Sequence, residues 1–186
     1  MSVTDWAESF IFWKINTQKV MLTMNREEED FDVSEQKCWE LLQDFIEHSN
    51  FKSNLKEFGR KEECNYVDAT GLTTSNQVLN MELKRRNSKL GQYSTLFAEG
   101  HKLADLYLDY FCLNKIPLYI NFLEDGHVVI YNLTKLKHRH EADKERKKWS
   151  QGYKAFEMSQ SQKLDVRDAY IYKRVGDKFR LIQKGW

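Results

Sequence analysis

The stretch VLNMELK, from Val78 to Lys84, alternates apolar and polar residues and predicts a β-strand. Successive side chains of a strand point to opposite faces, so its inner leucines and methionine are expected on one face, toward a core. Glu82 and Lys84 then share the other face. A carboxylate and an ammonium group on one face of a half-buried strand are the first candidates for chemistry in this chain.

A partner strand is expected immediately before this one. Residues 66–69 read as a short strand, and residues 71–76 (GLTTSN) are typical of a turn, so the pair predicts an antiparallel hairpin. Asp68, on the partner strand, can then reach the face that carries Glu82. The alternative is that Asp68 lies at a strand edge and that Glu82 and Lys84 form an exposed charge face.

The hairpin brings two carboxylates together. Two such groups repel unless a cation neutralises them, and their hard oxygen atoms suit Mg²⁺ or Mn²⁺. Lys84 beside the metal either orients the attacking water or removes its proton. Asp68, Glu82 and Lys84 therefore predict a metal-dependent site for cleaving phosphodiesters.

A helix is expected from Ser34 to about Asn50, because apolar residues recur there at helical spacing. Glu35 falls inside this apolar stripe, whereas Glu40 and Glu47 point away from it. A carboxylate on the core side is costly without a partner or ligand, which makes Glu35 a candidate third metal ligand. The alternative is a first-turn carboxylate stabilised by the helix dipole.

The rest of the sequence predicts an α/β layer, in which helices pack on the faces of a mixed sheet. The expected segments are a helix over 96–113, strands over 116–123, 127–133, 166–172 and 178–182, a partly helical charged segment over 135–162, and a helix or hairpin within 1–25. With 186 residues, one proline and eight glycines, the chain shows no linker, and we expect a single domain over 1–186.

Composition restricts the class of protein further. The N-terminus lacks the features of a signal peptide and no apolar run reaches ~18 residues, so we expect a soluble, cytoplasmic protein with no membrane partner. Cys38, Cys64 and Cys112 form no close pair, which predicts buried free thiols in a reducing compartment. A net charge of +1 indicates no partner by itself.

Basic residues nevertheless cluster near the candidate site. Arg85, Arg86 and Lys89 follow the strand directly, and Lys102 lies in the second expected helix, so all four are candidates for binding the phosphates of a nucleic acid. The alternative is ordinary solvated surface charge. Lys102 and Glu99 either complete the site together or form an ion pair along the helix.

These motifs resemble those of the PD-(D/E)xK nuclease superfamily, with its restriction-endonuclease-like fold. Asp68 corresponds to the motif aspartate, Glu82 and Lys84 to the ExK pair, and the segment that begins at Glu35 to a first helix with a metal-binding carboxylate. Val67 stands where the family name has proline. The likeness is closest to archaeal-type Holliday-junction resolvases and extends to uncharacterised phage and prophage proteins.

The resemblance implies an αβββαβ core over 34–133, with 1–33 and 134–186 as peripheral extensions. It also implies a Mg²⁺- or Mn²⁺-dependent DNA endonuclease of phage or mobile-element origin, resolvase-like or nicking, in which homodimers cut both strands. RNA substrates, and the choice between branched and linear DNA, stay open. The alternative is a non-catalytic nucleic-acid-binding or assembly protein that retains the nuclease fold.

Overall fold

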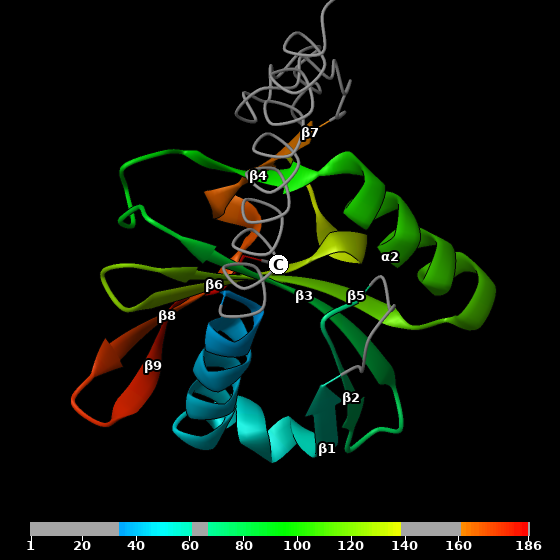
Figure 1. Cartoon of the computed structure of the whole chain (residues 1–186), viewed down its shortest axis with the longest axis horizontal. Helices are drawn as coiled ribbons and strands as arrows, with labels where there is room; N and C mark the ends of the chain where they lie inside the picture. The colour runs from blue at the N-terminus through cyan, green and yellow to red at the C-terminus, as the bar shows by residue number, and fades with distance from the viewer. Residues whose placement is uncertain (1–33, 61–66, 139–160, 186) are drawn as a thin grey trace, which may run out of the picture. The chain divides into compact units, whose positions relative to one another are not determined.

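Strand β3 (Val78–Arg86) forms where the alternating stretch predicts it and continues two residues further. In the described part of the chain it belongs to a seven-stranded sheet of order β1-β2-β3-β5-β6-β8-β9. Strands β3 and β5 run parallel, and the other neighbouring pairs in this sheet are antiparallel. The computed structural model is thus a mixed α/β fold with a mixed sheet and helices beside it (Figure 1).

The structure describes residues 34–60, 67–138 and 161–185. Its main elements are helix α1 (residues 34–47), β1 (Leu55–Arg60), β2 (Ala69–Thr73), β3, β4 (Thr95–Glu99), α2 (Gly100–Leu113), β5 (Ile116–Leu123), β6 (His127–Asn132), β7 (Ser161–Asp165), β8 (Tyr170–Val175) and β9 (Lys178–Gln183). The chain divides into two units, residues 1–37 and 38–186, and the sheet belongs to the second. None of the described helices is long and apolar enough to cross a membrane.

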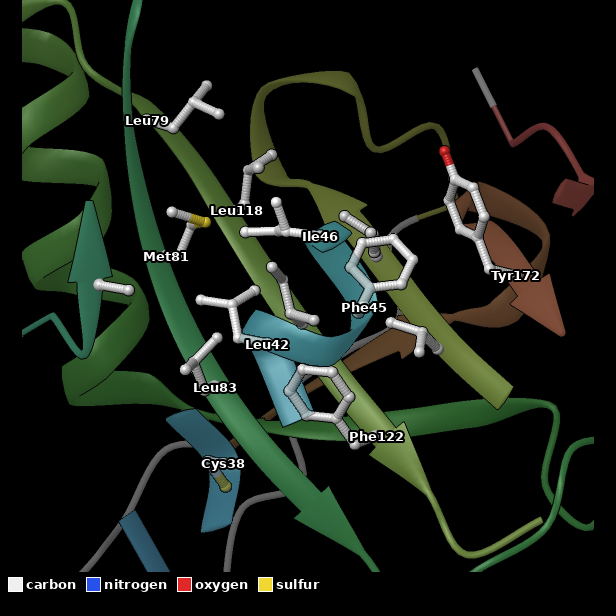
Figure 2. Packing of buried hydrophobic residues seen from close by; sticks show 14 of the residues in the cluster. Cys38, Leu42, Phe45, Ile46, Leu79, Met81, Leu83, Leu118, Phe122 and Tyr172 are labelled. Carbon is white, nitrogen blue, oxygen red and sulfur yellow. The ribbon is translucent and has the colours of Figure 1, made fainter. Parts of the chain in front are cut away.

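One face of the sheet is closed by α1 from residue 38 onward. Leu79, Met81 and Leu83 of β3 lie in one buried cluster with Leu42 and Phe45 of that helix, and Figure 2 shows these side chains meeting. The helical spacing of the apolar residues therefore predicted the buried side of α1 correctly. By strand alternation, Glu82 and Lys84 point to the opposite face.

The opposite face is covered by α2 and by a separate two-stranded sheet of β4 and β7 (Figure 1). Leu103 and Leu106 of α2 share a second buried cluster with Tyr119 and Tyr131 of the central sheet. The prediction that the second helix begins at Leu96 is wrong. Residues 95–99 pair with 161–165 instead, and this extra strand interrupts the expected order of elements.

Other boundaries also differ from the expectations. The predicted turn begins too early, because β2 continues to Thr73. Gly71 lies inside β2, where an added Cβ would contact Leu55 and Met81 side chains at 3.4 Å, so this position favours a small residue. Residues 161–183, expected to be peripheral, contribute three strands, two of which extend the central sheet.

The cysteine prediction holds in part. Cys38 is buried, but Cys112 is exposed on α2, so the expectation of a buried thiol is wrong there. Cys64, residues 1–33 and most of the charged segment over 135–162 lie outside the described residues.

Candidate active site on strand β3

The candidate site is centred on Glu82, whose side chain is fully buried between the sheet and α2. Its Oε1 atom lies 3.0 Å from Lys84 Nζ, and its Oε2 atom lies 3.5 Å from Lys102 Nζ. Both contacts are ion pairs, and neither oxygen atom accepts an aligned hydrogen bond. A buried carboxylate whose oxygen atoms accept no hydrogen bond is costly, and such positions are concentrated at functional sites.

The electrostatics of Glu82 reflect this environment. Burial and the negative charge of Asp68 together raise the pKa of Glu82 to about 7, against the positive charges of Lys84 and Lys102, which lower it. Asp68 and Glu82 are close enough for their charges to repel, as expected of two carboxylates that share a cation.

Asp68 was predicted to lie within a strand, but it lies one residue before β2 begins. Its backbone N–H donates to Met81 O at 3.1 Å, and its Oδ2 atom accepts a hydrogen bond of 2.6 Å from Leu83 N. The carboxylate therefore continues the hydrogen bonding of β3 where β2 begins. One oxygen atom thus has a structural role, and the aspartate is held beside Glu82.

Lys84 lies between two carboxylates. Its Nζ atom is 3.0 Å from Glu82 Oε1 and 3.0 Å from Glu99 Oε2. Burial by itself would lower the pKa of Lys84, but the charges of Glu82 and Glu99 outweigh burial and raise the pKa above its usual value. Two roles were considered for this lysine, orienting a water and removing its proton, and the ion pairs with Glu82 and Glu99 favour the first because both stabilise the protonated ammonium.

Glu99 and Lys102 flank the start of α2 and both contact β3. Glu99 reaches Lys84, and Lys102 reaches Glu82. The sequence left open whether Glu99 and Lys102 complete the site or pair with each other. Helical spacing could not decide this, because Glu99 is the last residue of β4, a strand that the sequence did not predict. The polar residues of the site therefore alternate in charge: Lys102, Glu82, Lys84, Glu99.

The basic candidates at the end of β3 differ from one another. Arg86 points inward, where it donates to Asn121 Oδ1 at 3.0 Å and to the carbonyl of Phe97. Arg85 and Lys89 are exposed, and Lys89 lies 3.9 Å from Glu124. Binding of phosphate by these residues stays a prediction, but the guanidinium of Arg86 already has oxygen partners inside the protein.

No family model matches the chain, and no curated protein matches it. Among solved structures, the fold is similar to Archaeoglobus fulgidus Hjc, a Holliday junction resolvase from an archaeal hyperthermophile. The two chains are 10% identical over 62% of this chain and 80% of that chain, with a TM-score of 0.41. A likeness at this level carries no argument about chemistry.

A divalent cation fits the Asp68–Glu82 pair. Mg²⁺ sites use one or two protein carboxylates and keep several waters, and the oxygen atoms of Glu82, which accept no aligned hydrogen bond, are suitable ligands. Among the described residues, no three His, Cys, Asp or Glu side chains gather as a metal-binding group. Glu35 lies in the first unit, residues 1–37, and its role as a third ligand stays a prediction.

Proposed function

We propose that this chain is a metal-dependent phosphodiesterase, specifically a DNA endonuclease of a resolvase-like or nicking kind. The observation that carries the proposal is the fully buried Glu82 carboxylate, which has no aligned hydrogen-bond donor and lies beside Asp68 and Lys84. A carboxylate in this setting is stabilised by a bound cation, and a cation next to a fixed ammonium group is suited to a phosphate.

Each residue has a distinct part in the proposal. Asp68 and Glu82 would hold Mg²⁺ or Mn²⁺, with Glu35 as the predicted third ligand. The metal, when bound, supplies an activated water and neutralises charge on the phosphate. Lys84 keeps its proton and offers a fixed positive charge to the phosphate in the transition state. Arg85 would contact a neighbouring phosphate at the exposed end of β3.

The finer parts of the proposal concern substrate and assembly. Cutting both strands of a branched or palindromic duplex requires two sites related by symmetry, so we propose a homodimer for a resolvase-like activity. A monomer would nick one strand. The resemblance to prophage proteins further suggests an origin in a phage or mobile element.

The test is cleavage of supercoiled plasmid, a four-way DNA junction and RNA, each with Mg²⁺, Mn²⁺ or EDTA. We expect metal-dependent cutting of DNA that falls about a thousandfold in Glu82→Ala, because a metal contributes several kcal/mol and each 1.36 kcal/mol is tenfold in rate. Lys84→Ala should lose a similar amount. Glu57→Ala, which removes an exposed carboxylate of β1, should keep the wild-type rate.

Circular dichroism of each variant separates loss of the site from loss of the fold. DNA binding without cutting under any metal would overturn the proposal and support a non-catalytic binding protein. Cutting that persists in EDTA would also contradict it.

A further inference from the structure

We propose that Glu99 is a positioning residue, which holds the ammonium group of Lys84 at the site without binding the metal itself. This inference rests on the proposed function for its catalytic consequence. The contact itself stands on the geometry of β3, β4 and α2.

The first support is the symmetric placement of Lys84 Nζ, 3.0 Å from a carboxylate oxygen on each side. A lysine side chain has about 2 kcal/mol of rotamer entropy to lose, so one anchor leaves the ammonium mobile. Glu82 would share its charge with a bound cation and attract Lys84 less strongly. Glu99 would then be the anchor that remains.

The second support comes from the start of α2. Glu99 occupies the N-cap position, where a short side chain such as that of Asp, Asn, Ser or Thr commonly accepts hydrogen bonds from the first backbone N–H groups. Glu99 makes no such capping bond. Its carboxylate contacts Lys84 instead. The side chain is thus directed to Lys84 on β3 and makes no bond to the end of the helix.

The third support is the fixed position of the strand that carries Glu99. Residues 95–99 pair in continuous register with 161–165, so Glu99 opposite Ser161 ends the ladder at a defined point. The side chain is 45% exposed, whereas that of Glu82 is 1% exposed. Glu82, which is buried beside Asp68, is therefore placed as a ligand, and Glu99 acts through Lys84.

The first arm of the test compares Glu99→Gln, Glu99→Asp and Glu124→Gln. Glu124 is a matched control, since it is 46% exposed and pairs with Lys89 at 3.9 Å. We expect Glu99→Gln to lower kcat about tenfold, the effect typical of residues that orient metal-site groups, without raising KM for DNA. Glu99→Asp should recover part of the rate, and Glu124→Gln should keep kcat unchanged.

The second arm uses calorimetric titration with Mg²⁺. Glu99→Gln should bind the metal as tightly as the wild type, whereas Glu82→Gln should bind it at least tenfold more weakly. Weakened Mg²⁺ binding by Glu99→Gln would overturn the proposal, because it would make Glu99 a ligand. Equal losses of kcat in Glu99→Gln and Glu124→Gln would overturn it as well.

The third arm needs no cutting activity. Glu99→Gln should lower the urea midpoint by about 0.2 M in the wild-type background and by nothing in a Lys84→Met background, because a residue pair in contact is not additive. Equal shifts in both backgrounds would overturn the pairing. A wild-type chain that cuts no substrate would instead defeat the proposed function, and the urea arm would still decide whether Glu99 anchors Lys84.

Discussion

The two faces of strand β3 are built from alternate residues of one stretch, yet they differ in kind. Met81 and Leu83 on one face are at most 4% exposed and lie in a cluster of buried hydrophobic side chains. Asn80 and Glu82 on the other face are at most 1% exposed, so burial is equally deep. Because one face is apolar and the other polar at equal burial, burial alone does not identify the part of a core that stabilises the fold.

The polar face is only partly satisfied by hydrogen bonds. Asn80 Nδ2 donates to Asp109 Oδ2 at 2.6 Å, which ties β3 to α2. Both oxygen atoms of Glu82 are in ion pairs but accept no aligned hydrogen bond, and one polar atom each of Asn80 and Asn121 has no hydrogen-bond partner. A polar network with unsatisfied members costs stability. The apolar face must offset that cost.

Truncation on the apolar face should give the largest loss of stability. Met81→Ala removes a fully buried side chain and should lower the free energy of unfolding by about 2–5 kcal/mol, measured by urea denaturation in EDTA. Cutting per folded molecule should persist at low temperature. Val78→Ala, at a 38% exposed position of the same strand, should cost less than about 1 kcal/mol. Similar losses in both variants would contradict the assignment of this face as the main core.

The polar face should impose a pH dependence on stability. The pKa of Glu82 is raised from 4.5 to about 7, so between these pH values the unfolded chain releases a proton that the folded chain keeps. The free energy of unfolding should therefore fall as pH rises through this window, by about 3 kcal/mol, and become level above it.

The measurement is urea unfolding in EDTA between pH 4 and pH 8. Glu82→Gln removes the titrating group and should lose this fall, while Glu57→Gln should retain it. Equal pH profiles for wild type and Glu82→Gln would show that Glu82 is not a costly buried charge.

The smallest effect, a change in DNA binding, is expected at the end of β3, where Arg85 and Arg86 follow the two faces. Arg85 follows the register of the apolar residues but is exposed beyond the core, whereas Arg86 follows the polar register and points inward. Arg85→Ala should weaken DNA binding by up to about tenfold and reduce the slope of log K against log salt by about 0.9. Arg86→Ala should lower stability and leave the slope unchanged. A slope change in Arg86→Ala alone would reverse these roles.

Much of this arrangement could be predicted from the sequence because it depends on local periodicity. Alternation in β3 placed Glu82 with Lys84, and helical spacing in α1 placed Leu42 and Phe45 in the core. Both patterns extend over enough residues to separate a period of two from a period of 3.6. The start of α2 was predicted wrongly, because β4, the strand before it, has only five residues and is too short for the two periods to be told apart.

The sequence by itself thus determined the faces of β3, the buried side of α1 and the candidate residues Asp68, Glu82 and Lys84. Only the tertiary structure decided that residues 95–99 form a strand, since their partner strand begins at Ser161. The tertiary structure also brings Glu99 into an ion pair with Lys84, and Arg86 into a hydrogen bond with Asn121. These contacts join segments far apart in the chain, and no local pattern specifies which partner a charged side chain meets after the chain has folded.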